Sequence, residues 1–524
     1  MTELHAADII VFLGYVAALL AIGLWAGRKT SGEAAGFFLT SKSLPWYAIG
    51  PAIIAAGISS EQFLGTVGFA YDNGLAVANW EWLNGPAILI LTFIFVPFYI
   101  RRKVVTMPQF LEMRFDGRVR SLFAVITLLT YIFINLAGVI YSGGFALNVI
   151  FGIDLYAAMW GMTVLGGLFV IYGGMESVAW TNVFQAVLLL GSGLLVFFLG
   201  LFEVPGGWDE IIGEGTRGHL VLPADHPVLP GTGLLVLALS TNVWFFCSNQ
   251  MINQAVLGAK NEWHARLGVL LAGFLGILIA FADTFPGMIA FALNPNLATA
   301  DSAYPYVVGR LVPIGLRGIV FAGLTGAILS TIEALGNASS TIFTMDIYKR
   351  HLRPAAEDKE LIRAGRIVSA VVLIVGALWA PTVMSFGHIF SYFQEGWAFI
   401  AIPIAVIFVL GVLWRRVTTT AALWTLLLSF PMLVLPYLLR ALEVKMNVFN
   451  VAGFVLIFTL LFTVVLSLVT REKHPEGKEK FIWRPSMARL TWDPRIGELP
   501  WYRKLSFWTM VLVSMYVFIY ATLW

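Results

Sequence analysis

Five carboxylates stand within or at the edges of long apolar runs of this 524-residue chain, namely Glu61, Glu81, Asp283, Glu333 and Glu395. An unpaired carboxylate at the centre of a bilayer costs at least about 2.5–3.5 kcal/mol, so such residues face protein or a water-filled cavity. Glu61 and Glu81 are followed closely by Gln62 and Asn84. Carboxylates and amides without an accompanying cation suit a neutral polyhydroxylated ligand, whose hydroxyls donate to them.

Adjacent hydroxyls form a second group, Ser330 and Thr331, in the apolar run 303–350. They offer hard oxygen ligands of the kind that an alkali cation needs. Hydroxyls in membrane helices more often bond to the carbonyl four residues earlier, and taken alone these two fit that interpretation. An ion site competes with it if a broken helix elsewhere supplies free carbonyls.

One apolar segment is interrupted in a way that could free such carbonyls. From Pro45 to Leu64 the chain reads PWYAIGPAIIAAGISSEQFL. The segment 233–256 is interrupted similarly, at Asn242 and from Cys247 to Gln250, and five spans later it crosses in the opposite direction. Two broken helices at corresponding positions indicate an inverted-repeat secondary transporter. Ordinary helices with polar contacts to their neighbours are the alternative.

Composition places these segments in an all-α polytopic membrane protein. The chain is 59% hydrophobic and 12% charged, whereas soluble proteins carry about 25% charged residues. Apolar runs of about 20 residues mark about fourteen transmembrane helices. We place them near 6–27, 44–70, 74–100, 118–150, 156–173, 178–203, 233–256, 263–294, 303–350, 360–381, 384–413, 418–437, 447–470 and 504–524.

The loops alternate in charge. Lys/Arg-rich loops, which mark the cytoplasmic side, follow the first, third and ninth spans, whereas the segment 203–230 is acidic and rich in Pro and Gly. This predicts a multi-pass protein of the cell (inner) membrane with both termini extracytoplasmic. The N-terminus has no basic region or cleavage site of a signal peptide, so we expect a retained first helix.

The sequence lacks the motifs of several function classes. The sequence has no GxxxxGK[ST] phosphate loop, no HExxH and no Cys/His cluster, so an ATP motor and a zinc enzyme are unsupported. Cys247 is the only cysteine, which excludes an intrachain disulfide. We find no nucleophile–base pair, so the sequence does not predict an enzyme, and energy for transport must come from a gradient.

At these residues the chain resembles the sodium:solute symporter family, and within it the SGLT-type sodium/sugar cotransporters of the bacterial sodium/galactose type. The matching stretches are FFLTSKSLPWYAIG, AAGISSEQFLG, NWEW, LTYIFINLAGVIYSGG, IYGGMESVAWTNVFQ, FQEG and STIFTMDIYK. They cover the chain to about residue 415. The resemblance implies a LeuT-type core of two inverted five-helix repeats.

The resemblance also sets the expected organisation. We expect an extra N-terminal helix and cytoplasmic loop at 1–43, the first repeat at 44–203 and an extracytoplasmic loop at 204–232. The second repeat follows at 233–413, and peripheral C-terminal helices, with a cytoplasmic loop at 471–504, follow at 414–524.

Residue roles follow from the same resemblance. The family's sodium site falls on the carbonyls of Ala55, Ile58 and Ala327 and the hydroxyls of Ser330 and Thr331. Its substrate contacts fall on Gln62, Glu81, Asn84, Asn242 and Gln394. Its inner gate falls on Phe245, where a tyrosine is usual, and its outer gate on Thr66, Trp80 and Phe390. Glu61 matches no ligand position, and we expect it to hold the interrupted segment in place.

Two departures from the family pattern bear on function. Gly276 stands where a sugar-contacting lysine is common, which leaves a different sugar, a polyol or a deoxy sugar open. Asn182 replaces an aspartate that contributes to a second sodium site in some members, while Glu333 stands one turn beyond Ser330. We favour Glu333 as a buried protonated acid with one sodium bound. The alternative is a second ion site or pathway in which the carboxylate has moved from Asn182 to Glu333.

The sequence therefore predicts a sodium-coupled symporter that takes up a sugar or sugar-like polyol by alternating access. The expected partners are that solute, Na⁺ and the lipid bilayer, with no nucleic acid and no obligatory protein partner. A symporter of the same family for another organic solute is one alternative, and a sodium-binding sensor or channel without coupled uptake is another. Proton coupling stays open, although hydroxyl and carbonyl ligands suit sodium better.

Overall fold

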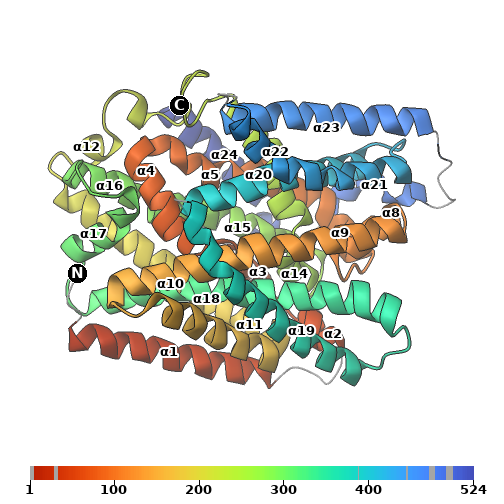
Figure 1. Ribbon diagram of the computed structural model, residues 1–524, viewed down its shortest axis with the longest axis horizontal. Coiled ribbons are helices and arrows are strands. Elements are labelled where there is room, and N and C mark those ends of the chain that lie inside the picture. The colour runs from red at the N-terminus through yellow and green to blue at the C-terminus, as the bar shows by residue number, and fades with distance from the viewer. Residues whose placement is uncertain are drawn as a thin grey trace.

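The fold is built from helices. The computed structural model of the protein describes residues 5–28, 34–386, 389–443, 447–470, 472, 478–490 and 500–524. Within these ranges the single extended pairing is a bridge between Leu44 and Ala259. Most long helices lie along the long axis of the molecule (Figure 1). The predicted all-helical architecture is therefore confirmed.

Nine helical runs among the described residues are long and apolar enough to cross a membrane. They are α1 (Ala6–Gly27), Glu61–Arg101, Gly117–Val149, α11 (Leu155–Glu203), Glu262–Leu293, Leu316–Leu352, Asp358–Phe386, α23 (Val448–Thr470) and α24 (Leu505–Leu523). A bent pair of helices within 233–257 gives a tenth. Three shorter apolar helices, at Trp46–Gly57, Phe399–Leu413 and Thr419–Leu435, are below the length of about 20 residues that a span needs. The count of fourteen spans stays a prediction.

The longest helix, α11, contains a break. Its 49 residues would extend about 74 Å at 1.5 Å per residue, more than twice the thickness of a bilayer core. Gly174 has φ 57° and ψ −153° inside it, a conformation that is open essentially only to glycine. A Cβ there would also lie 2.6 Å from the carbonyl oxygen of Phe37. The break falls between the expected spans 156–173 and 178–203.

Both segments that the sequence marks as interrupted are broken in the structure. Helix α3 (Trp46–Gly57) ends where Ile58 turns extended, with φ −113° and ψ 123°, and the chain resumes in the π-helical turn η2 (Glu61–Thr66). The other segment bends by 47°, where Asn249 is extended. Its parts are α13 (Gly233–Val236), η7 (Leu237–Thr241), η8 (Trp244–Ser248) and α14 (Gln250–Leu257).

Helix α18 (Leu316–Ile342) forms the centre of the molecule. Every residue from Val320 to Ile342 is buried, and the helix packs against α1, α3 and α11. It continues into the π-helical segment η10 (Phe343–Leu352). Because no face of α18 is left for lipid over this stretch, its hydroxyls and carboxylate must be satisfied inside the protein.

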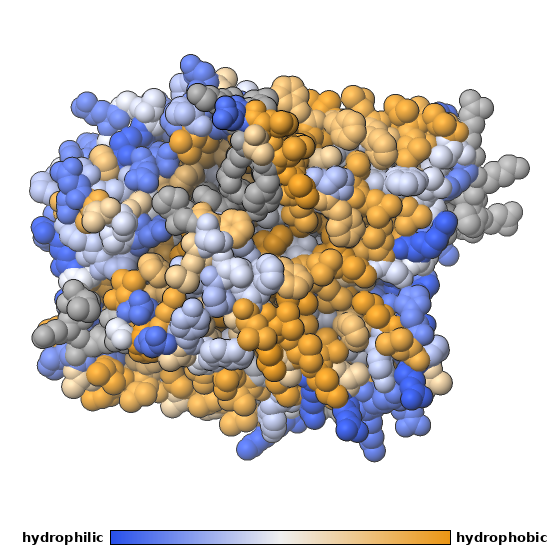
Figure 2. Space-filling view, in the orientation of Figure 1, coloured by the Kyte–Doolittle hydropathy of each residue, from blue (hydrophilic) through white to orange (hydrophobic). Residues whose placement is uncertain are grey.

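Figure 1 shows both ends of the described chain in the left half of the view, the N-terminal end below α17 (Ala303–Leu311) and the C-terminal end at the upper edge, to the right of α12 (Trp208–Ile212). The Leu220 N–H donates to the Leu523 carbonyl at 2.9 Å, which ties α24 to the segment after α12. Figure 2 shows polar residues at the two ends of the long axis and apolar residues between them. This distribution matches helices that cross an apolar layer.

Candidate functional site

The break after α3 removes helical partners from two carbonyls. The last regular bond of the helix runs from Ile58 N–H to Ile54 O at 2.9 Å. The next amide, that of Ser59, donates instead to the Gln62 side-chain carbonyl at 2.9 Å. Gln62 N–H in turn donates to Ser59 O at 3.2 Å. The carbonyls of Ala55 and Ile58 are thus left without the amides that an unbroken helix would supply.

Hydroxyls from α18 meet these carbonyls. Ser330 Oγ lies 2.7 Å from Ala55 O, and Thr331 Oγ1 lies 3.4 Å from Ile58 O. Both hydroxyls also reach the Ala327 carbonyl, at 2.9 and 3.2 Å. The structure therefore brings together the five residues that the sequence analysis assigned to sodium. Ala56 O, at 3.2 Å from Thr331 Oγ1, is a further oxygen that the sequence analysis missed.

This oxygen cluster is neutral and buried. Ala55, Ala327 and Ser330 are fully buried, and Thr331 is 4% exposed. Within the described part of the chain, no group of three His, Cys, Asp or Glu side chains could hold a metal ion. Carbonyl and hydroxyl oxygens are hard ligands. The donor set therefore fits a hard monovalent cation better than a transition metal.

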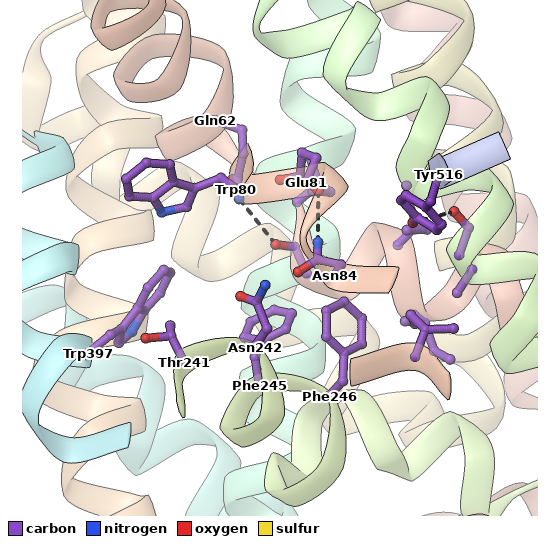
Figure 3. Close-up of a pocket in the computed structure, with 18 residues that line it drawn as sticks. Gln62, Trp80, Glu81, Asn84, Thr241, Asn242, Phe245, Phe246, Trp397 and Tyr516 are labelled. Carbon is purple, nitrogen blue, oxygen red and sulfur yellow. Dashed lines mark hydrogen bonds between the residues drawn. The ribbon is translucent and has the colours of Figure 1, made fainter. Parts of the chain in front are cut away.

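A cavity that Gly57 and Ile58 help to line lies beside the oxygen cluster, and Figure 3 shows the residues around it. Its volume of about 60 Å³ is enough for a few water molecules. Its polar and aromatic lining is Gln62, Trp80, Glu81, Asn84, Thr241, Asn242, Phe245, Phe246, Trp397 and Tyr516. No lysine or arginine is among the lining residues that the structure describes. Through its described lining the cavity thus offers hydrogen-bond groups, aromatic faces and one carboxylate, that of Glu81.

Four predicted substrate contacts line this cavity. Asn84, the first residue of α6 (Asn84–Ile90), directs its amide to Glu81 Oε2 at 3.3 Å. The Asn242 amide nitrogen is buried without a hydrogen-bond partner among the described residues. Such a donor is available to a ligand. The fifth predicted contact, Gln394, has a side chain outside the described residues.

Gln62 connects the cavity to the broken helix. While lining the cavity, it accepts from Ser59 N–H and donates to Gly57 O at 3.4 Å. The Glu61 carboxylate accepts from the Ser59 hydroxyl and does not line the cavity. These contacts agree with the structural role expected of Glu61. They also mean that a ligand bound to Gln62 acts on the backbone of the broken segment, which carries the Ala55 and Ile58 carbonyls.

The predicted gate residues take different positions. Trp80 lines the cavity and packs edge-on against Phe69 and Phe449, with ring centroids 6.0 and 5.7 Å apart. Phe245 lines the cavity from η8 and lies 6.4 Å from the Trp397 ring. Thr66 is buried at the end of η2, outside the cavity lining. The Phe390 side chain lies outside the described residues.

A second buried polar cluster lies between α11 and α18. Glu333 Oε2 accepts from Thr181 Oγ1 at 2.8 Å. The Asn182 side-chain oxygen is buried without a hydrogen-bond partner among the described residues, and the Gln185 amide lies close to both Glu333 and Tyr15. The two residues named for a second ion site or pathway, Asn182 and Glu333, thus lie on neighbouring helices, each with a buried oxygen to offer.

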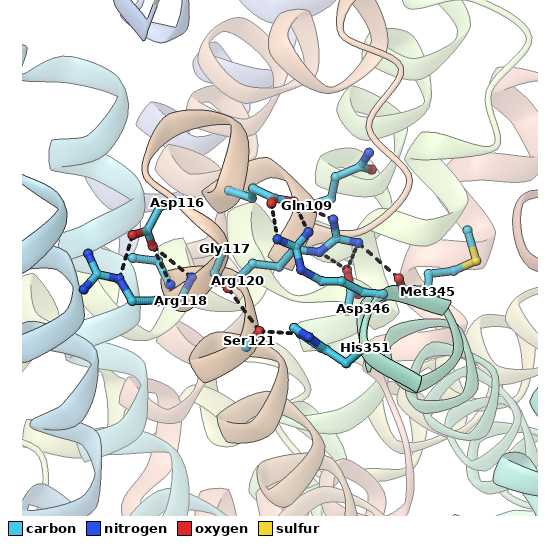
Figure 4. Close-up of polar contacts among 12 residues, drawn as sticks. Gln109, Asp116, Gly117, Arg118, Arg120, Ser121, Met345, Asp346 and His351 are labelled. Carbon is cyan, nitrogen blue, oxygen red and sulfur yellow. Dashed lines mark hydrogen bonds and ion pairs between the residues drawn. The ribbon is translucent and has the colours of Figure 1, made fainter. Parts of the chain in front are cut away.

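An ionic network joins two segments at one end of the bundle (Figure 4). Arg120, on α9 (Gly117–Thr130), pairs with Glu112 of α8 (Met107–Arg114) at 2.6 Å and with Asp346 of η10. Arg350 of η10 also pairs with Glu112, at 2.5 Å. Thr106 donates to Asp346 at 2.8 Å. The network links α8 and α9 to the continuation of α18, and the sequence analysis did not predict it.

Four polar or aromatic cavity residues were also missed, namely Thr241, Phe246, Trp397 and Tyr516. Trp397, on α20 (Ile389–Leu413), donates to Asn135 Oδ1 at 3.2 Å. It stands three positions after Gln394, so the helical repeat could have placed it on the same face. Tyr516 belongs to α24, which the sequence analysis grouped with the peripheral C-terminal helices. No local signal in the sequence distinguishes it from a lipid-facing tyrosine.

Comparisons with known proteins give consistent matches. The model of the sodium:solute symporter family matches residues 37–429. A sodium/glucose cotransporter of Vibrio parahaemolyticus is 33% identical over 90% of this chain and 92% of its own length. Sodium/glucose cotransporter 4 of Mus musculus is 32% identical over 94% of this chain and 78% of its own.

Solved structures support the fold. The structure of a Na⁺-coupled sialic acid symporter superposes with a TM-score of 0.78 at 21% identity, covering 89% of this chain and 98% of that one. A transporter of the nucleobase-cation-symport-1 family gives a TM-score of 0.54 at 16% identity, covering 85% and 97%.

Proposed function

Because the chain belongs to the sodium:solute symporter family, we propose that it is a sodium-coupled secondary active symporter that takes up a neutral sugar or sugar-like polyol. The observation that carries the proposal is the convergence of the Ser330 and Thr331 hydroxyls on the free carbonyls of broken α3. Relatives named as sodium/glucose cotransporters support the same choice of ion and solute.

Sodium is a transported substrate in this proposal. Its ligands are the carbonyls of Ala55, Ile58 and Ala327 and the hydroxyls of Ser330 and Thr331. The hydroxyls now donate to those carbonyls. On binding, the ion takes over the carbonyl lone pairs, and the hydroxyls turn their own lone pairs toward it. Sodium thereby bridges α3 to α18 and favours the conformation in which the two helices are close.

The solute occupies the adjacent cavity, which must widen from its present volume of about 60 Å³ to admit a hexose. Glu81 accepts from its hydroxyls, while Gln62, Asn84 and Asn242 both donate and accept. The lack of lysine and arginine in the described lining favours a neutral solute over an anionic one. We retain Gln394 as a further contact, with Phe245 as inner gate and Thr66, Trp80 and Phe390 as outer gate.

Coupling follows from the shared backbone. Gln62 touches both the cavity and the broken helix, so sodium and solute stabilise one arrangement of this segment. One charge crossing 100 mV supplies about 2.3 kcal/mol, and a tenfold sodium gradient adds about 1.4 kcal/mol. Together these sustain a solute gradient of roughly several hundred-fold. We propose one sodium per cycle, with Glu333 as a structural acid bonded to Thr181.

The proposal includes an arrangement in the membrane. The core is of the LeuT type, with two inverted five-helix repeats at 44–203 and 233–413 within about fourteen spans. Both termini are extracytoplasmic in the cell (inner) membrane. Support comes from the breaks in α3 and before α14 and from the contact of α24 with the 204–232 segment.

Uptake into proteoliposomes tests the proposal. Vesicles with the full-length protein receive an inward sodium gradient, and labelled hexoses, deoxyhexoses and polyols are offered. In the control vesicles potassium replaces sodium, or a pH gradient is imposed without sodium. We expect accumulation above the external concentration with sodium only. Equilibration without accumulation would indicate a channel. Uptake driven by protons alone would contradict sodium coupling, and no uptake of any of these solutes would contradict the solute class.

A further inference from the structure

Helix α24 closes one side of the cavity with a stripe of three side chains. Leu512, Tyr516 and Tyr520 recur every four residues and therefore share one face of the helix. Leu512 is fully buried. Tyr516 lines the cavity and donates its hydroxyl to Gly273 O at 3.2 Å, and Tyr520 donates to Asn79 Oδ1 at 2.6 Å. The helix is thus fixed to the core at both sides of Tyr516.

Two glycines allow α24 to come this close. A Cβ on Gly85 of α6 would lie 2.8 Å from the Tyr516 ring. A Cβ on Gly273 of α15 (Glu262–Asp283) would lie 2.9 Å from Leu512. Real Cβ atoms do not approach so closely without a shift of the neighbour. Gly85 and Gly273 therefore allow α24 to pack directly against the helices that line the cavity.

A third glycine leaves open space. A Cβ on Gly276, one turn along α15 from Gly273, would meet no atom within 4 Å, although Gly276 lines the cavity. The cavity therefore has open space beside Gly276, and we call this part of it the α15–α24 lobe. Its walls are Ile88, Ala272, Gly273, Gly276 and Tyr516. Ile88 stands one turn after Asn84 on α6, so the lobe adjoins the polar part of the cavity.

The lobe is almost without hydrogen-bond partners. Its side chains are apolar except for Tyr516, whose O–H is directed to Gly273 O. The amide and carbonyl groups of 272–276 lie inside a regular helix and are bonded along it. Among the described residues, a hydroxyl placed there would meet the Tyr516 oxygen, which already donates to Gly273 O, and carbonyls that are already bonded along α15. An apolar substituent would instead contact the tyrosine ring and the isoleucine.

We infer that the α15–α24 lobe receives an apolar substituent of the solute and that Tyr516 is a specificity-determining residue. In a hexose, the substituent that fits is the methyl group of a 6-deoxy sugar, with ring hydroxyls facing Glu81 and Asn84. This inference rests on the proposed function and narrows its solute class. Figure 3 shows Tyr516 on the opposite side of the cavity from Trp397, so the two aromatic residues bracket the polar groups between them.

The expected preference for a methyl over a hydroxymethyl substituent has an upper limit. An apolar pocket discriminates against an added hydroxyl by about a hundredfold at most. Tyr516 can accept one bond, which reduces the penalty. We therefore expect a 6-deoxy sugar to bind about tenfold or more tightly than its partner with a hydroxymethyl group.

Matched sugar pairs test this in the full-length protein. Sodium-dependent binding is measured for D-fucose against D-galactose, L-fucose against L-galactose, L-rhamnose against L-mannose and 6-deoxy-D-glucose against D-glucose. Each pair differs only in methyl against hydroxymethyl, so the comparison needs no variant. The sugar pair that binds is then used to measure the methyl preference of the variants.

Variants of the lobe sharpen the test. Gly276→Leu fills the open space and should abolish the methyl preference, with affinity falling about tenfold or more. Gly276→Ser adds a donor and should shift the preference toward hydroxymethyl. Tyr516→Phe should retain the methyl preference, because the ring remains. Gly191→Leu is the matched control, since Gly191 is an exposed glycine of α11 whose Cβ would also meet nothing within 4 Å.

The outcomes separate the two proposals. Methyl preference that is lost in Gly276→Leu and kept in Gly191→Leu supports the inference. Sodium-dependent binding with equal or better affinity for the hydroxymethyl sugar overturns the inference and leaves the symporter proposal standing. Failure of every sugar to bind in sodium, when polyols also fail, overturns the proposed function together with the inference.

Discussion

The Ser330 hydroxyl lies 2.7 Å from the Ala55 carbonyl, although the two residues are 275 positions apart in the chain. The contact exists because α3 breaks at Ile58 and because α18 carries its hydroxyls on the face that meets the break. A regular helix would have closed the Ala55 carbonyl with the Ser59 amide, which here donates to Gln62. The broken backbone is therefore the condition for an oxygen site between the two helices.

Replacing Ser330 by alanine tests the sodium site. Ser330→Ala removes one of the proposed cation ligands, and a bond to a charged group contributes about 1.5–3 kcal/mol. We expect the half-saturating sodium concentration to rise about tenfold or more, while Ser330→Thr keeps most of the affinity. Ser339→Ala is the matched control, because Ser339 is a buried serine of the same helix without a described hydrogen-bond partner. Unchanged sodium dependence in Ser330→Ala would refute this site.

The sequence predicted the residues whose chemistry is visible locally. A glycine, serines and a Glu-Gln pair in an apolar run mark the break after α3, and adjacent hydroxyls mark the facing side of α18. Tyr516 could not be found in this way, because its role depends on packing of α24 against glycines more than two hundred positions away. Tertiary packing alone shows that Tyr516 faces the cavity.

Glu81 and Asn84 allow solute binding to be separated from sodium binding. Glu81→Gln keeps the size of the side chain but loses the charge-assisted bonds, which are roughly twice as strong as neutral ones. We expect solute affinity to fall about tenfold in Glu81→Gln and less in Asn84→Ala, with sodium binding nearly unchanged in both. Scintillation proximity binding of solute and of ²²Na⁺ measures the two effects separately.

The control for these variants is Asn450→Ala. Asn450 accepts from Thr232 at 3.0 Å on α23, and it does not line the cavity. The solute affinity of the Asn450→Ala variant should equal that of the unmodified protein. An equal loss of affinity in Asn450→Ala and Asn84→Ala would show that the effect is a general loss of stability, and would count against the assigned contacts.

Variants of Glu333 test how many sodium ions are coupled per cycle. The Glu333 Oε2 atom accepts from Thr181, a contact that a neutral acid or an amide oxygen can also make. If one sodium binds per cycle, Glu333→Gln should leave the sodium Hill coefficient of uptake unchanged, and Asn182→Ala should do the same. A Hill coefficient that falls in both variants would instead place a second cation between α11 and α18.

Gly174 provides a prediction about folding. Alanine at φ 57° and ψ −153° pays a backbone penalty of about 1–3 kcal/mol, and its Cβ would lie 2.6 Å from Phe37 O. We expect Gly174→Ala to lower the melting temperature and the yield of folded protein in detergent. Gly161→Ala, in the same helix but with no atom within 4 Å of its Cβ, should leave both unchanged. Equal stability of the two variants would contradict the conformation described for the break.

The network at Glu112 provides the last prediction, because it joins α8 and α9 to η10. Glu112→Gln removes the charge that both Arg120 and Arg350 share. Arg118→Gln is the matched control, since Arg118 pairs only with Asp116 in the described structure and is largely exposed. If the network holds this end of the bundle closed, Glu112→Gln should raise sodium-independent exchange several-fold, and Arg118→Gln should not.

The ionic network also determines how the effect of Glu112→Gln on sodium-independent exchange depends on pH. Burial by itself would raise the pKa of Glu112, but the hydrogen bonds and charges of Arg120 and Arg350 outweigh it and lower the pKa. A carboxylate with a lowered pKa stabilises the folded contact above its ordinary pKa of about 4.3 and loses this contribution as the pH falls through the lower value. The difference in exchange between Glu112→Gln and the unmodified protein should therefore stay constant from about pH 8 to pH 5.5. A difference that disappears within this window would show that Glu112 is already protonated there, and would remove the network as the cause.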